Sequence, residues 1–124
     1  MECTTQDIAN VLVVRVHGRI DHTTAKAFET VLLPQLDGCT GDTKKVLLDL
    51  SGVPYMSSDG LRVLTLAAKQ CQSQQAVIVV AALQPLLQEV FHISRFDTIF
   101  QVFRTVREAL QEMSPEAASA YGED

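Results

Sequence analysis

The sequence of 124 residues lacks the features that define several large classes of protein. Its three cysteines, Cys3, Cys39 and Cys71, have no paired spacing and no CxxC motif, which excludes a disulfide framework and a zinc site of the cysteine–histidine type. No apolar run approaches the roughly 18–20 residues that cross a bilayer, and the first ten residues do not resemble a secretory signal. We therefore expect a cytoplasmic protein without membrane insertion.

Positive charge is also sparse. Ten lysines and arginines are scattered along the chain against fifteen acidic residues, and the net charge is −5. Direct binding to nucleic acid needs a basic cluster that neutralises phosphates. We expect no direct nucleic-acid binding, whereas a protein partner stays compatible with this charge.

The common motifs of nucleotide binding and catalysis are missing. The chain has no GxxxxGKS or GxxxxGKT loop, no GxGxxG loop and no GxSxG elbow. The histidines His17, His22 and His92 could assist a nucleophilic serine or cysteine, but no spacing places them beside one. We expect no catalytic residues and no enzymatic activity.

Three aspartates could in principle hold Mg²⁺, because two of them follow strand ends in an α/β pattern. These are Asp21 and Asp49, with Asp59 as a third carboxylate. A helix cap at Asp21 and a strand end at Asp49 are simpler interpretations, and no second phosphate-binding element accompanies them. We expect neither a metal nor a cofactor.

Apolar patterns predict strands and helices in alternation, and hence helices packed on a mostly parallel sheet of four or five strands. The expected strands are Val11–Val16, Val46–Leu50, Ala76–Ala82 and Ile99–Phe103, with a short edge strand in Glu2–Asn10. About four helices are expected: from Ala25 to a kink or end near Pro34, from Asp59 past Cys71, over Leu83–Phe91, and from Thr105 to Met113. Loops are expected over Asp37–Lys45 and His92–Thr98. We predict one α/β domain over residues 1–113, and a flexible acidic tail over 114–124.

The stretch Val46–Leu64 is the most informative part of the chain, because it predicts a buried strand, a tight loop and a helix start. Ser57, Ser58 and Asp59 fall where that helix begins. One serine could simply cap the helix, a role worth about 1 kcal/mol. The other could be phosphorylated, since an added phosphate at a helix N-terminus disturbs the fold little but disrupts a docked partner.

The stretch DLSGVPYMSSDGLRVL, from Asp49 to Leu64, resembles the signature of STAS domains, and in particular of bacterial anti-sigma factor antagonists. VLVVRVHGRIDHTTAKAFETVLLPQL resembles the early strand, turn and first helix of these domains, and HISRFDTIFQVFRTVREAL resembles their closing segment. The resemblance extends over Asp7–Met113.

The resemblance implies an α/β sandwich without enzymatic activity. Anti-sigma factor antagonists of this family bind an anti-sigma factor, commonly a serine kinase of the GHKL type, and so release a sigma factor by partner switching. The kinase phosphorylates a serine at the start of the second helix, and a PP2C-type phosphatase reverses this. Ser58 matches that serine, with Ser57 as the alternative because the acidic neighbour here follows at Asp59 instead of preceding the serine. The implied partner-binding residues are Asp21, Met56, Ser57, Ser58, Asp59, Gly60, Leu61 and Arg62.

A second hypothesis keeps the fold and changes the role. The chain would be a STAS interaction module without phosphorylation, such as the cytosolic partner of an ABC-type ATPase in lipid transport. A small hydrolase using Ser58 or Cys71 is a third class, for which the sequence shows no oxyanion or base motif. The sequence does not predict the oligomeric state.

Overall fold

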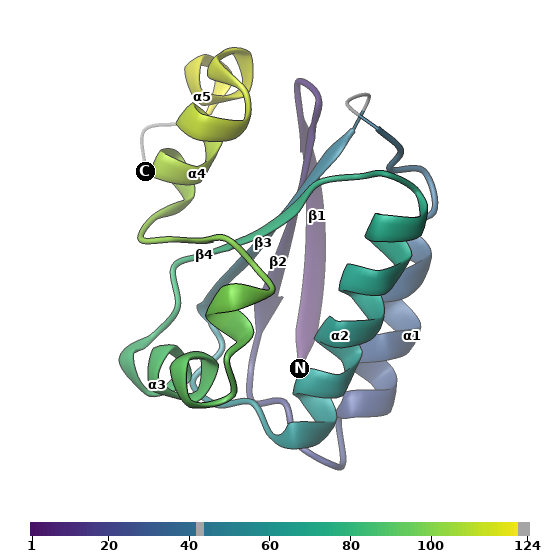
Figure 1. Ribbon diagram of the computed structural model, residues 1–124, viewed down its shortest axis with the longest axis vertical. Helices are drawn as coiled ribbons and strands as arrows, with labels where there is room; N and C mark the ends of the chain where they lie inside the picture. The colour runs from purple at the N-terminus through teal and green to yellow at the C-terminus, as the bar shows by residue number, and fades with distance from the viewer. Residues whose placement is uncertain (42–43, 122–124) are drawn as a thin grey trace.

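A five-stranded sheet in the order β1-β2-β3-β4-β5 forms the centre of the computed structural model, which describes residues 1–41 and 44–121 (Figure 1). β1 pairs antiparallel with β2, and the other neighbouring strands are parallel. The strands are β1 (Glu2–Ile8), β2 (Val11–His17), β3 (Lys45–Gly52), β4 (Ile78–Ala81) and β5 (Val102–Phe103).

The described residues form five α-helices and one 3-10 helix. Side chains of α1, α2 and α3 and of the 3-10 helix η1 pack on one face of the sheet, and those of α4 and α5 pack on the other. The helices are α1 (Ala25–Gln35), α2 (Ser58–Ser73), α3 (Pro85–Ile93), η1 (Phe96–Thr98), α4 (Val106–Met113) and α5 (Pro115–Ala120). The predicted α/β class and the mostly parallel sheet are confirmed.

The apolar runs of the central strands exist because both faces of the sheet are covered. In β3, Val46 and Leu48 face the core under α1–α3, whereas Leu47 between them faces the core under α4 and α5. In β4, Val80 and Val79 alternate in the same way. Residues on both faces of these strands are therefore buried, and their apolar runs are continuous. A strand with one face in water would instead alternate apolar and polar residues.

The helix boundaries follow local signals. Pro34 lies in the last turn of α1, which ends one residue later, and Pro85 lies at the start of α3, where its missing N–H costs nothing. At α4, the Thr105 hydroxyl accepts a hydrogen bond from the Glu108 amide at 3.1 Å, as the capping spacing predicts. In a full capping box the Glu108 carboxylate would also accept a hydrogen bond from the Thr105 amide. Here it accepts one from the Arg104 guanidinium instead, at 2.6 Å.

The C-terminal segment differs from the prediction, because α5 forms within the residues that we expected to be an irregular tail. Ser114 caps this helix by accepting a hydrogen bond from the Ala117 amide at 3.2 Å, and Ala117 is fully buried beside α4. The sequence pattern missed the helix because six residues, four of them alanine or serine, carry little amphipathic signal. The mobility of this segment and the domain boundary at residue 113 stay predictions, and residues 122–124 lie outside the described part of the chain.

The remaining differences are small. The expected loop over Asp37–Lys45 falls partly outside the described residues, at positions 42–43, and Lys45 belongs to β3. The expected strand Ile99–Phe103 shortens to the two residues of β5, because the Ile99 and Phe100 amides donate to the Phe96 carbonyl and form a turn after η1. Among the described residues, no helix is both long enough and apolar enough to cross a membrane.

Candidate functional site

The loops that follow β2 and β3 meet beside the start of α2. The Ile20 amide donates to the Tyr55 carbonyl at 3.0 Å, and the Ser57 amide donates to the Ile20 carbonyl at 2.8 Å. These bonds form an isolated parallel bridge between Ile20 and Met56. They bring Asp21 next to the loop that carries Ser58, although the two residues are far apart in the sequence.

Ser57 and Ser58 have different environments. Ser58 is the first residue of α2 and is exposed, so its hydroxyl is accessible to an enzyme. Ser57 occupies the N-cap position, but its side chain makes no capping hydrogen bond. Its buried Oγ atom finds no hydrogen-bond partner among the described residues. Of the two serines expected to offer a cap, Ser57 therefore holds the N-cap position but does not make the capping bond.

Replacing Ser57 by alanine is expected to change the free energy of unfolding by less than about 0.5 kcal/mol, because no capping bond is lost and a buried unpaired hydroxyl is removed. Thr105→Ala removes a real cap and should cost about 1 kcal/mol. Urea denaturation of both variants measures this difference. A cost for Ser57→Ala as large as that for Thr105→Ala would show that Ser57 caps α2 in solution.

Asp21 organises the neighbouring turn before α1. Its carboxylate accepts hydrogen bonds from the Thr23 hydroxyl at 2.6 Å and from the Thr23 amide at 2.9 Å, and Arg19 lies 3.3 Å from its other oxygen. These contacts stabilise the ionised form, the Thr23 hydroxyl most of all, and lower the pKa of Asp21 from 3.8 to about 2. The carboxylate is therefore a fixed negative charge beside the Ser58 loop at physiological pH.

Because its pKa is lower in the folded protein than in the unfolded chain, Asp21 adds stability that is complete above about pH 4 and is lost as the pH falls toward 2. Asp21→Asn should therefore remove part of the acid sensitivity of unfolding in this interval and leave the dependence above pH 5 unchanged. Chemical denaturation at pH 5 and pH 2.5 tests this.

In Thr23→Val, NMR titration should show the Asp21 pKa moving up toward its ordinary value, and an unmoved pKa would contradict the assigned cause.

Two of the predicted partner-binding residues are not at the surface. Met56 is only 1% exposed, and Gly60 is buried against it. A Cβ atom at Gly60 would lie 2.4 Å from Met56 Cγ and 2.7 Å from Ile20 Cγ2, so the first turn of α2 rests directly on these side chains. This corrects the predicted docking surface: both residues position the helix start and offer no side chain to a partner.

The other predicted residues lie at or near the surface. Asp59 and Arg62 are exposed on α2, Leu61 is half-buried, and Arg62 pairs with Glu29 of α1 at 3.2 Å. Asp59 lies in the first turn, where a negative side chain is favourable to the helix. The exposed positions around the helix start are Ser58, Asp59 and Arg62, with the half-buried Asp21 beside them, and their role in partner binding stays a prediction.

Sequence reasoning missed one pair at this site. The guanidinium of Arg19 lies over the ring of Tyr55, 4.4 Å from its centroid. The two residues come from different loops, and no spacing in the sequence connects them. The stacked pair adds a cationic and aromatic patch beside Asp21, of the kind that is enriched in protein interfaces.

The structure does not bring the three aspartates together as metal ligands. Asp49 is almost completely buried. Its carboxylate accepts a hydrogen bond from the Ser51 amide at 3.0 Å and lies 3.5 Å from Arg15 Nε, and these contacts offset the cost of burying the charge. Within residues 1–41 and 44–121, no group of three or more His, Cys, Asp or Glu side chains is placed to hold a metal ion. The site is therefore a solvent-facing helix start with hydroxyl, acidic and basic groups.

A mixed sheet covered on both faces, with an exposed serine at the start of its second helix, defines a small α/β domain with a surface site. The sequence profile of the STAS domain matches residues 2–109, and the chain belongs to the STAS domain family. It is 38% identical over 102 residues to BtrV of Bordetella bronchiseptica, a candidate anti-sigma factor antagonist, covering 82% of this chain and 85% of BtrV.

Solved structures agree with this assignment. An anti-sigma factor antagonist domain from Planctomyces limnophilus superposes with a TM-score of 0.81 at 25% identity, covering 90% of this chain and 97% of that one. SpoIIAA of Bacillus in its phosphorylated form has a TM-score of 0.61 at 16% identity, covering 90% and 98% of the two chains, which is a likeness of fold alone. The predicted family is confirmed.

Proposed function

We propose that this protein is an anti-sigma factor antagonist that works by partner switching under the control of Ser58. In its unphosphorylated form it binds an anti-sigma factor of the GHKL serine kinase type. Phosphorylation of Ser58 by that kinase ends binding, and a PP2C-type phosphatase restores it. The proposed activity is binding without catalysis, in the cytoplasm, where a sigma factor acts.

The observation that carries this proposal is the contrast between the two serines at the start of α2. Ser58 is exposed in the first turn, whereas the Ser57 hydroxyl is buried. A kinase can reach the first hydroxyl without any movement of the backbone. This favours Ser58 over the alternative Ser57 as the modified residue. The 38% identity to BtrV and the family membership support the class of partner.

The surroundings of Ser58 explain how a small modification would have a large effect. A phosphate adds about −1.5 to −2 charges at the N-terminus of α2, where the helix dipole favours an anion by about 0.3–1 kcal/mol. Asp59 beside it partly offsets this gain, and Arg62 one turn later lies on the same side of the helix. The folded state therefore tolerates the phosphate. A partner docked over Ser58 would have to desolvate the charge, which is far more costly.

A phosphorylation assay tests the proposal. The purified protein is incubated with ATP and each GHKL-type kinase of the organism that supplies the sequence, and a phosphate-affinity gel separates the products. We expect a shifted band for wild type and Ser57→Ala, no shift for Ser58→Ala, and loss of the shift after treatment with a PP2C-type phosphatase. An undiminished shift in Ser58→Ala would contradict the assignment of the site.

Co-purification separates this function from a STAS module without phosphorylation. Tagged wild-type protein should retain a GHKL-type kinase, and this retention should disappear with Ser58→Asp. Retention of an ABC-type ATPase that is indifferent to Ser58→Asp would support the transporter-associated role instead.

A further inference from the structure

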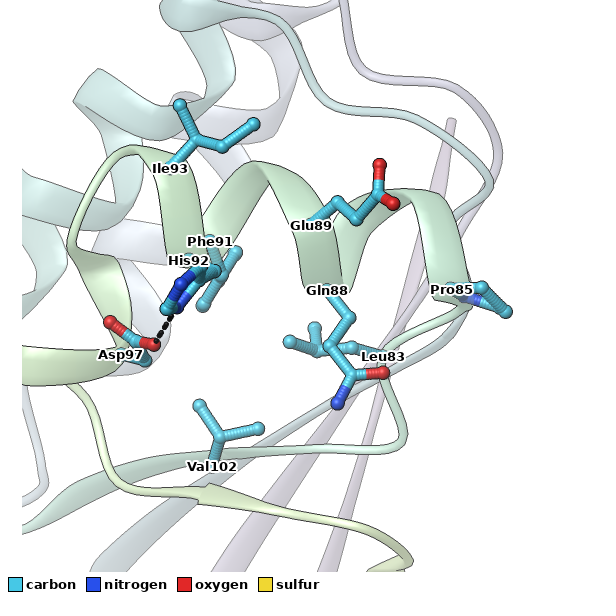
Figure 2. Close-up of a pocket in the computed structure, with 9 residues that line it drawn as sticks. All are labelled: Leu83, Pro85, Gln88, Glu89, Phe91, His92, Ile93, Asp97 and Val102. Atoms are coloured by element: carbon cyan, nitrogen blue, oxygen red, sulfur yellow. Dashed lines mark hydrogen bonds and ion pairs between the residues drawn. The ribbon is translucent and has the colours of Figure 1, made fainter.

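The space between α3 and the edge strand β5 forms a slot that the Ser58 site does not use. Its open cavity measures about 830 Å³. Figure 2 shows α3 on one side and Val102 of β5 on the other, with the Gln88 amide and the His92–Asp97 pair at the two ends. The residues that define this α3–β5 slot are Leu83, Gln88, Phe91, His92, Asp97 and Val102.

The backbone of β5 leaves one residue with its hydrogen-bonding groups turned outward. The Gln101 and Phe103 carbonyls accept hydrogen bonds from the Val80 and Ala82 amides of β4, each at 3.0 Å. Backbone groups of successive residues in a strand point in opposite directions, so the Val102 N–H and C=O point away from β4. β5 is the last strand of the sheet among the described residues. Val102 can therefore pair with one residue of an added strand.

Side-chain alternation places the slot where such a strand would need it. Val102 packs toward the core under α3, whereas Phe103 packs toward the core under α4 and α5. A residue paired directly with Val102 would direct its side chain to the same face. That side chain would enter the α3–β5 slot, against Leu83 and Phe91 at its base.

Charges at the two ends of the slot indicate the sequence of its occupant. Arg104, which pairs with Glu108 at 2.6 Å, lines a hollow that continues the slot beyond Val102. Asp97, which contacts His92 at 3.1 Å, lines the opposite end, so an occupant would share both charges with these neighbours. In an added antiparallel strand whose central residue lies opposite Val102, the residue two positions before it would lie near Arg104. The residue two positions after it would lie near Asp97. His92 and Arg95 also line the Asp97 end, so the buried side chain and the backbone bonds contribute more than the charge.

We propose that the α3–β5 slot binds an extended segment of another protein by adding a sixth strand antiparallel to β5. The segment carries an aliphatic residue opposite Val102, with an acidic residue two positions before it and a basic residue two positions after it. Backbone pairing would supply affinity, and the slot would supply selectivity for the central side chain. This surface would serve a partner other than the one bound at Ser58, and it does not depend on phosphorylation.

Amide hydrogen exchange measured by NMR tests the proposal on the full chain. The probe is the acetylated and amidated pentapeptide Glu-Thr-Val-Thr-Lys, at up to about 5 mM because an affinity this weak is expected for five residues. We expect exchange of the Val102 amide to slow at least about fivefold at saturation. The same peptide with an N-methylated valine lacks the central donor and should give no protection.

A variant in which a larger side chain fills the α3–β5 slot tests whether the peptide binds there, and the same substitution on another helix is its control. Gln88→Phe fills the slot from an exposed position of α3 and should abolish the protection, whereas Gln72→Phe makes the same change on the exposed face of α2 and should not. The proposal is overturned if the peptide fails to bind, if it binds without slowing Val102 exchange, or if Gln88→Phe binds it as well as wild type does. None of these readouts requires the kinase, so they are separate from the test of Ser58.

Discussion

Ser58→Asp is expected to weaken binding to the proposed anti-sigma factor kinase by at least about 100-fold, while the free energy of unfolding changes by less than about 1 kcal/mol. The carboxylate imitates part of the phosphate charge at an exposed helix N-terminus, where it costs the fold little. In the complex, the same charge would be removed from water against the partner. Isothermal titration calorimetry gives the affinity, and urea denaturation gives the stability.

Two variants control this result. Ser119→Asp makes the same change at an exposed position of α5, on the other face of the sheet, and should bind the kinase as wild type does. Ser58→Ala should bind with nearly unchanged affinity, because it adds no charge. If Ser58→Asp bound normally, the surface around α2 would not be the docking site. If it unfolded the protein, Ser58 would have a structural role.

Gly60→Ala is expected to destabilise the protein by about 1–3 kcal/mol, although alanine is the better helix former by about 1 kcal/mol. The added methyl group would meet Met56 Cγ at 2.4 Å and Ile20 Cγ2 at 2.7 Å, and both partners are buried in the core. Overpacking of this degree outweighs the gain in helix propensity. Thermal and urea denaturation measure the balance.

Gly38→Ala, in the turn after α1, controls for the effect of the added methyl group alone. A Cβ atom at Gly38 would meet nothing within 4 Å, so the same change should be nearly neutral. Met56→Ala makes room beside Gly60, and the double variant Met56→Ala, Gly60→Ala should be more stable than the sum of the two single effects predicts. Additive effects would show that the methyl group does not contact Met56.

The Gly60 contact also connects the core to the surface site. Because the first turn of α2 rests on Met56 and Ile20, the position of Ser58 is set by packing beneath it. The backbone bonds that Ile20 makes to Tyr55 and Ser57 hold the same loop from the side. A change at Gly60 should therefore also weaken kinase binding, although Gly60 offers no side chain to the partner.

Much of the architecture was predictable from the sequence, because local patterns and tertiary burial agree in this chain. The run Ala76–Ala82 contains β4, and Pro85 and Thr105 mark the starts of α3 and α4, because in each case the signal acts within a few residues. α5 was missed because a helix of six residues has too few positions to show an apolar face. Its formation depends on the burial of Ala117 beside α4.

The start of α2 shows most clearly what the sequence determined and what the tertiary structure decided. The sequence by itself determined that a strand, a tight loop and two serines precede a helix, since composition and spacing over a few residues specify these features. Only the tertiary structure decided which hydroxyl is exposed, that Ser57 forms no cap, and that Met56 and Gly60 are core residues. It also placed Asp21 and the Arg19–Tyr55 pair beside Ser58. These properties depend on contacts between loops distant in the chain, which no local pattern encodes.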